Sequence, residues 1–142
     1  MSFANVNWIS VFVAAVAAWI FGAIYYTALA NAWHAAQGKT LEQCKAENAG
    51  KPALAKAAPF ILSFIGEVIM GVTIYGILVH GNMFTVRAGA ISGAFCWFGF
   101  VLTTIAINNA YTNRSAKLTA LDAGHWLGVL VIIGAIVGWW GR

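Results

Sequence analysis

Residues 121–140 read LDAGHWLGVLVIIGAIVGWW, and this stretch decides the fold class. It contains no Lys or Arg, and its two polar ionisable residues, Asp122 and His125, both lie near its start. An α-helix of about 20 predominantly apolar residues is long enough to cross the hydrocarbon layer of a bilayer. The stretch therefore predicts a membrane-spanning helix.

Three other stretches have similar length and composition, at residues 8–32, 60–79 and 88–107. Their apolar runs are continuous, whereas strands of a membrane barrel alternate apolar and polar residues over about ten positions. The segments between them are too short to hold a second folded domain. The sequence predicts an all-α protein, a four-helix transmembrane bundle with antiparallel neighbours, in which residues 1–142 form a single integral membrane domain.

The overall composition supports a lipid environment. Of the 142 residues, 61% are hydrophobic and only 8% are charged, while a soluble domain typically carries about 25% charged residues. The net charge of +4 comes from scattered basic residues that form no continuous stripe, so nucleic acid is not predicted as a partner. Membrane lipid is the expected contact of much of the surface.

The connections carry ordinary helix signals. In the polar loop of residues 33–58, Thr40 and Gln43 have the spacing of a capping box, which predicts a short surface helix over residues 41–48 between the first two spans. Pro59 is predicted to open the second span as a first-turn proline. Thr119 with Asp122 is predicted to start the fourth.

The basic residues are unequally divided between the two ends of the predicted bundle. One end holds six: Lys39, Lys45, Lys51, Lys56, Arg114 and Lys117. The end with both termini holds Arg87 and Arg142. Because Lys and Arg accumulate in cytoplasmic loops, loops 33–58 and 108–120 are predicted to be cytoplasmic and both termini to lie outside.

Small residues recur at helical spacing in the last two spans. The pairs lie four residues apart: Gly89 and Gly93, Gly124 and Gly128, Gly134 and Gly138. Such residues let membrane helices approach closely. Two interpretations remain open: the pairs pack the helices of one chain, or one pair, on the last helix, faces a second protomer or a partner subunit.

Glu67 is the one carboxylate placed deep in a predicted span. An ionisable group at that depth is costly and defaults to a functional hypothesis. The predicted proton or ligand site places it with other polar residues of similar depth around one cavity: Tyr25, Tyr26, Thr104 and His125. The alternative is structural, with Glu67 donating a hydrogen bond that fixes the helix register.

Metal and catalytic motifs are weak or missing. Asp122 and His125, even with His34, are too few and too loosely spaced to indicate a metal, so neither metal nor cofactor is predicted. The sequence has no Gly-x-Ser-x-Gly elbow, no phosphate loop and no His-Glu-x-x-His helix. The protein is therefore predicted not to be an enzyme.

Three segments resemble a bacterial membrane family known as the domain of unknown function numbered seventeen sixty-one. They are GAIYYT at residues 22–27 followed by Trp33, GAFCWFGF at residues 93–100, and KL with DAGH at residues 117–125. Tyr25 stands where Trp is usual in this family, and His125 where Tyr is common. The resemblance implies four spanning helices and no established activity.

The leading functional prediction is association. A small inner-membrane bundle with abundant small-residue pairs and small loops is expected to act as a homo-oligomer or as an accessory subunit of a larger membrane complex. One alternative is a small proton-coupled transporter or channel that uses Glu67. Another is a protein that binds lipid or an isoprenoid quinone.

Overall fold

A computed structural model describes residues 5–142, which contain helices and no strand. Four helical stretches are long and apolar enough to cross a membrane. They are α1 (Trp8–Ala28), α4 (Ala53–Gly81), the continuous helix Val86–Tyr111, and α7 (Ala116–Trp140). The third consists of α5 (Val86–Cys96), a π-helical turn (Trp97–Leu102) and α6 (Thr103–Tyr111). The predictions of an all-α chain and of four long apolar helices are confirmed.

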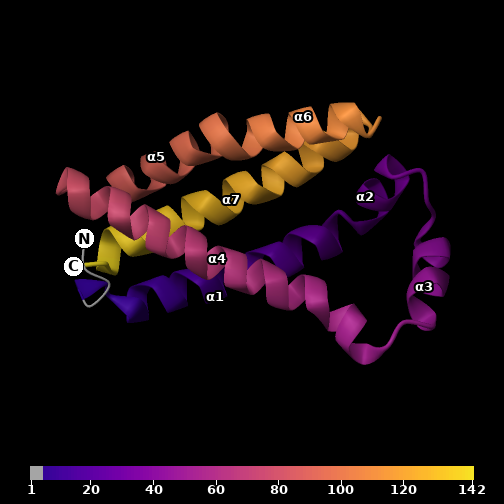
Figure 1. Cartoon of the computed structure of the whole chain (residues 1–142), viewed down its shortest axis with the longest axis horizontal. Coiled ribbons are helices and arrows are strands. Elements are labelled where there is room, and N and C mark those ends of the chain that lie inside the picture. The colour runs from indigo at the N-terminus through magenta and orange to yellow at the C-terminus, as the bar shows by residue number, and fades with distance from the viewer. Residues whose placement is uncertain (1–4) are drawn as a thin grey trace.

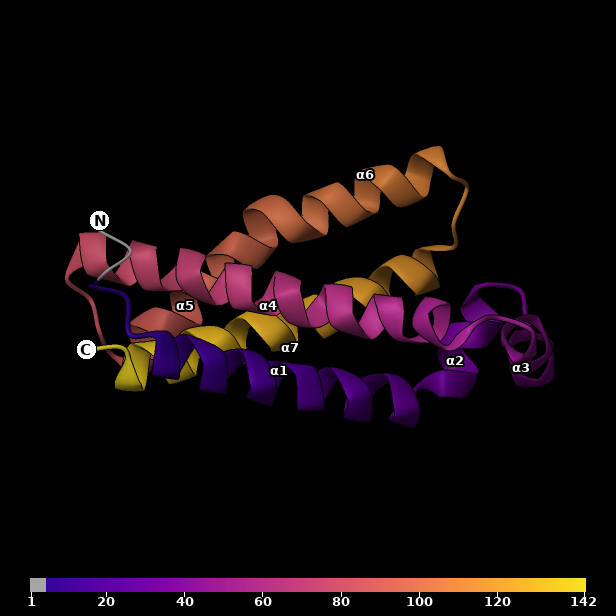
Figure 2. The same cartoon turned by 60° about the horizontal axis from the view of Figure 1, so that its bottom comes forward.

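The long helices lie side by side and run alternately in opposite directions (Figures 1 and 2). The start of α1, the turn between α4 and α5, and the end of α7 lie together, and we call this the terminal end. The opposite end holds α2 (Ala30–Ala36), α3 (Leu41–Ala49) and the turn between α6 and α7. We call it the loop end.

Helix α7 is central, because it packs against α1, α4 and α5. The buried core consists of aliphatic side chains from α1, α4 and α7, among them Val11, Ala14, Ala18, Ile74, Leu78, Val129, Ile133 and Val137. Ala14, Ala15 and Ala18 of α1 are buried, and at Gly71 the α4 backbone lies against Val11.

Helices α5 and α7 are in backbone contact through glycines. A Cβ atom added at Gly89 would collide with the carbonyl oxygen of Gly134, and one at Gly93 with the carbonyl oxygen of Leu130. At Gly138 it would collide with the carbonyl oxygen of Thr85. These glycines therefore pack the helices of one chain.

The second long helix begins seven residues before the predicted start. Pro52 is its N-cap, and Pro59, predicted as a first-turn proline, lies inside the helix. Residues 53–58 are Ala, Leu, Ala, Lys, Ala and Ala, and all three residue types favour helix strongly. Helix propensity thus extends α4 into what was predicted as the end of the polar loop 33–58.

The last helix also begins earlier than predicted. Its N-cap is Ser115, whose hydroxyl accepts a hydrogen bond from the backbone N–H of Leu118 at 3.1 Å. Thr119 and Asp122 do not cap it: Thr119 accepts from the Asn109 amide at 3.0 Å. The prediction that Thr119 starts the helix is wrong, because Ser115 has the same capping chemistry one turn earlier.

The first predicted span, 8–32, is divided in the structure. Helix α1 ends at Ala28, and Leu29 (φ −103°, ψ 14°) redirects the chain into α2. Beyond it, α3 has the capping box predicted from Thr40 and Gln43, with both reciprocal hydrogen bonds present.

An exposed ion pair joins Lys39, in the connection between α2 and α3, to Glu47 on α3. The Lys39 ammonium donates to the Glu47 carboxylate at 2.7 Å, which lowers the pKa of Glu47 and raises the pKa of Lys39. The Glu47 contribution is present above its unfolded pKa and is lost as pH falls through its folded pKa. We expect the amide protection factors of α3, which are corrected for the intrinsic pH dependence of exchange, to fall on acidification in the wild type, and this fall to be absent in Glu47→Gln. Glu42→Gln is the matched control on the same helix and should retain it.

The π-helical turn marks the point where the third long helix leaves the other helices. On its N-terminal side α5 packs closely on α7, and at its start Trp97 donates through Nε1 to the Ala123 carbonyl at 2.7 Å. Beyond it, α6 packs on α7 only and lies apart from α1 and α4 (Figures 1 and 2). A π turn is a frequent cause of such a change in helix direction.

Candidate functional site

A polar cluster at the loop end is centred on Asp122, near the start of α7. Its Oδ1 atom accepts hydrogen bonds from the Tyr26 hydroxyl at 3.0 Å and from Trp33 Nε1 at 2.9 Å. Tyr26 is on α1 and Trp33 is on α2. The interruption of the helix at Leu29 therefore lets two consecutive helices contact one carboxylate. Hydrogen bonds to an ionised acceptor are among the stronger ones in proteins.

His125, one turn further along α7, is buried in an aromatic enclosure. Its ring centroid lies 4.7 Å from that of Tyr26 and 4.9 Å from that of Trp126. Phe21 stacks nearly parallel to it, with an interplanar angle of 8°. Its Nε2 atom lies against Gly22, and its Nδ1 atom has no hydrogen-bond partner among residues 5–142.

The glycines at the start of α7 make room for these rings. A Cβ atom at Gly128 would collide with the Phe21 ring, and one at Gly124 would lie 3.0 Å from the Tyr25 hydroxyl oxygen. The Tyr25 hydroxyl donates to the Leu121 carbonyl at 3.0 Å. Gly124 and Gly128 therefore pack α7 against the aromatic face of α1.

A cavity of about 370 Å³ opens beside this cluster. It is lined mainly by polar side chains from α2, α6, α7 and the turn before α7, namely Trp33, Gln37, Asn108, Asn109, Thr112, Arg114, Leu118 and Asp122. It contains one carboxylate and one guanidinium. Such a site suits a small ligand that carries charges of both signs.

The model of a protein family described as "Protein of unknown function (DUF1761)" matches residues 9–138. The chain belongs to this family. The resemblance predicted from the three sequence segments is thus confirmed. No curated protein and no solved structure matches the DUF1761 chain.

Two of the segments that carry the DUF1761 resemblance meet in space at this cluster. Tyr26 and Trp33 belong to the first, and Asp122 and His125 belong to the last. From the sequence, Asp122 was predicted as part of a helix cap, and Trp33 was given no role in the site. Trp33 and Asp122 both belong to segments that carry the family resemblance, and that is the sequence signal that could have identified them. The hydrogen bonds to Asp122 join these two segments across about ninety positions of the chain.

The predicted site residues of this DUF1761 member are only partly brought together. Tyr25, Tyr26 and His125 are neighbours. Thr104 is exposed on α6 and does not line the loop-end cavity, so the structure does not bring it together with these three residues. Glu67 lines none of the three cavities described here, and no described hydrogen bond or ring contact joins it to the cluster.

Glu67 is itself almost completely buried. Its side chain is 1% exposed, and its Oε2 atom has no hydrogen-bond partner within the described chain. It lies one turn before Gly71, on the face of α4 that packs against α1. Burying a polar atom without a partner costs free energy.

We expect Glu67→Leu to raise the free energy of unfolding by about 1–2 kcal/mol, because it removes an unpartnered buried oxygen at similar side-chain volume. Denaturant titration in bicelles measures it. Glu67→Gln, which keeps the shape and the polar atoms, is the matched control and should be close to wild type. A loss of stability in Glu67→Leu would contradict the unpartnered state of the carboxyl group.

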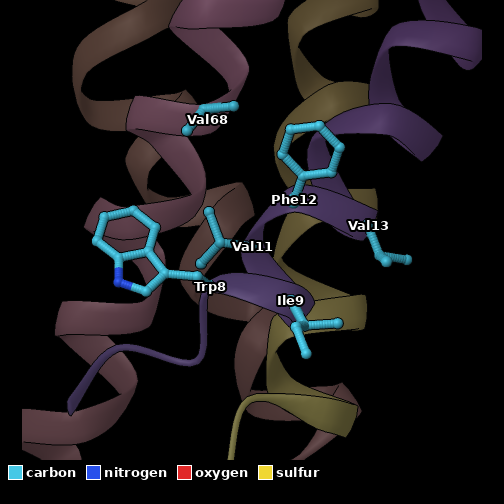
Figure 3. A pocket seen from close by; sticks show the side chains of 6 residues that line it. All are labelled: Trp8, Ile9, Val11, Phe12, Val13 and Val68. Atoms are coloured by element: carbon cyan, nitrogen blue, oxygen red, sulfur yellow. The ribbon is translucent and has the colours of Figure 1, made fainter. Parts of the chain in front are cut away.

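Two other cavities are less suited to binding a polar ligand, because one is apolar and the other is more open. One of about 350 Å³ is an apolar groove at the terminal end (Figure 3), and it is lined by Trp8, Ile9, Val11, Phe12 and Val13 on α1 and by Val68 on α4. The other, of about 330 Å³, lies among α2, α3 and the start of α4 and includes His34, Cys44 and Lys56. No group of three or more metal-ligating side chains occurs in residues 5–142.

Proposed function

We propose that this DUF1761 protein is a non-enzymatic, multi-pass protein of the bacterial inner membrane that acts through helix association, as a homo-oligomer or as an accessory subunit of a membrane complex. One observation carries the proposal. In the helix Val86–Tyr111, only 6% of an 18-residue apolar stretch is buried within the chain. The corresponding share in the other three long helices is 28% to 39%. This helix is the least covered by its own chain.

Exposed small and polar residues occur on this helix beside exposed apolar ones such as Phe98 and Phe100. Gly99, Thr103, Thr104 and Asn108 are all exposed, and a Cβ atom at Gly99 would meet nothing within 4 Å. Small and hydroxyl-bearing residues favour helix association in membranes because they permit close approach and interhelical hydrogen bonds. The glycines of α7 already pack against α1 and α5 of the same chain. We therefore assign association to α6 and the π turn instead.

The four long helices are proposed to span the bilayer as an antiparallel bundle. The six basic residues of loops 33–58 and 108–120 favour a cytoplasmic loop end with both termini outside. Helix α3, which contacts α2 beyond the long helices, is then proposed to lie at the cytoplasmic membrane surface. Membrane lipid is the expected partner of the exposed apolar side chains.

Disulfide crosslinking in native membranes tests the association. In a background of Cys44→Ser and Cys96→Ser, Thr103→Cys on α6 should form a crosslinked dimer or heteromer with a membrane-permeable oxidant. Ile24→Cys is the matched control, because Ile24 is 63% exposed on the opposite helix α1 and should stay monomeric. Equal labelling of both cysteines by a maleimide shows that both are accessible. Monomer only at Thr103→Cys would contradict the proposal.

A proton-coupled transporter or channel is a second candidate, favoured by one observation: the unpartnered buried oxygen of Glu67. Intramembrane carboxylates often mark proton pathways. Flux measured in proteoliposomes with Glu67→Gln tests it, since a carrier that uses this carboxylate would lose proton coupling. Unchanged coupled flux would remove Glu67 from any such pathway.

A further inference from the structure

The loop-end cavity brings together two opposite charges that do not neutralise each other. Asp122 and Arg114 both line it. The ion pair found in the described part of the chain is Lys39–Glu47, so neither cavity charge is engaged in one. A cavity that keeps a carboxylate and a guanidinium apart offers one binding group for each end of a zwitterion.

The Asp122 carboxylate is held in a fixed orientation. Its Oδ1 atom accepts from Tyr26 and from Trp33, which come from two different helices. Neither the Tyr26 hydroxyl nor the Trp33 indole carries a formal charge, so the negative charge of the carboxylate is not cancelled by them. A ligand ammonium group would supply the missing cation as a charge-assisted hydrogen bond.

The backbone of Arg114 is held in the turn between α6 and α7. Its N–H donates to the Asn109 carbonyl at 2.8 Å, across a turn in which Asn113 has a φ of 53°. Asn tolerates this left-handed conformation better than most residues. Arg114 is exposed and lines the cavity, and a guanidinium is well suited to bind a phosphate through two parallel hydrogen bonds.

The cavity also lies at a defined level. It is formed by the loop-end parts of α6 and α7 with α2, just beyond the apolar middle of the long helices. If these helices span the bilayer, as proposed above, this is the level of lipid headgroups. Phosphate and ammonium groups are both abundant there.

We propose that this cavity binds a zwitterion that joins a primary ammonium to a phosphate, as in the headgroup of an ethanolamine phospholipid, with Asp122 binding the ammonium and Arg114 the phosphate. The amides of Gln37 and Asn108 supply further hydrogen-bonding groups on the lining. The site lies within one chain, so it rests on the proposed membrane embedding but not on association between chains.

Lipid retention measured by native mass spectrometry tests this site. The protein is purified from nanodiscs that contain equal amounts of phosphatidylethanolamine, phosphatidylcholine and phosphatidylglycerol. The wild type should retain phosphatidylethanolamine about ten-fold over either competitor, since each competitor lacks one of the matched hydrogen-bonding groups. Asp122→Asn should lose the preference over phosphatidylglycerol, and Arg114→Gln should retain less of all three.

Matched controls separate the site from general charge effects. Arg87→Gln removes an exposed arginine at the terminal end, and Glu42→Gln removes an exposed carboxylate on α3. Both should keep the wild-type preference. In Asp122→Asn the amide oxygen can still accept hydrogen bonds from Tyr26 and Trp33. Arg114 is exposed and does not belong to the buried core. Both variants should therefore remain folded, as measured by circular dichroism.

Competition with soluble glycerophosphoethanolamine identifies the source of the ligand. Displacement of the bound lipid by this compound assigns the site to the zwitterion itself, and resistance to it assigns the site to the intact lipid. Equal retention of the three lipids by the wild type would overturn the proposal, as would an unchanged preference in both cavity variants. Crosslinking at Thr103→Cys reports on association separately, and carbonate extraction reports on membrane embedding.

Discussion

Gly89→Ala is expected to lower the free energy of unfolding by about 3 kcal/mol, a large effect for the addition of one methyl group. The added Cβ atom would collide with the carbonyl oxygen of Gly134, which is backbone and cannot rotate away. Helices α5 and α7 would have to separate along their whole contact. That contact is the most extensive between any two helices of the chain.

Another glycine provides a control of opposite sign. A Cβ atom at Gly66 would meet nothing within 4 Å. Alanine favours helix over glycine by about 1 kcal/mol, so Gly66→Ala should be neutral or stabilising. Unfolding in mixed micelles, followed by circular dichroism, measures both variants. A Gly89→Ala variant as stable as Gly66→Ala would show that the α5–α7 contact is not close.

Asp122→Ala should destabilise the chain by about 3 kcal/mol, because it leaves two buried or partly buried donors without an acceptor. These are the Tyr26 hydroxyl and Trp33 Nε1. The loss should be concentrated at the loop end, where α2 is attached to α7. Asp122→Asn keeps an acceptor oxygen and should cost about 1 kcal/mol.

Combining Asp122→Ala with Tyr26→Phe tests the assignment further. Once the acceptor is gone, removing the Tyr26 hydroxyl should cost little or even restore stability, so the two changes are expected to be non-additive. Denaturant titration of the four members of the cycle gives the coupling energy. Glu42→Ala, at an exposed site on α3, is the control for charge loss. Strict additivity would mean that the 3.0 Å contact does not contribute to stability.

The parts of the fold that could be predicted are those fixed by local chemistry. Continuous apolar runs predicted the four long helices, and the Thr40–Gln43 spacing predicted the capping box of α3. The errors lie where two residues offer the same local signal. Pro52 and Pro59 both suit a helix start, as do Ser115 and Thr119, and composition alone does not choose between them.

The site was harder to predict because it depends on how helices are placed in three dimensions. Tyr26 and His125 were grouped by depth along the chain, and depth is preserved when helices pack antiparallel. Thr104 was grouped by the same reasoning, yet α6 turns away after the π-helical turn, which no periodicity in the sequence announces. Asp122 was missed because a carboxylate near a helix start resembles a cap until its partners are known.

The π-helical turn at Trp97–Leu102 also bears on how the length of this chain can vary. Hydrogen bonds from residue i to i+5 enclose one residue more than those of an α-helix. Removing one residue inside this turn would convert it to α-helix and would keep the helical phase of α5 and α6 on either side of it. The same deletion within α5 would rotate one end of the helix against the other by about 100°. The helix Val86–Tyr111 thus contains one extra residue in its π-helical turn, and the loss of that residue would keep both halves of the helix in phase.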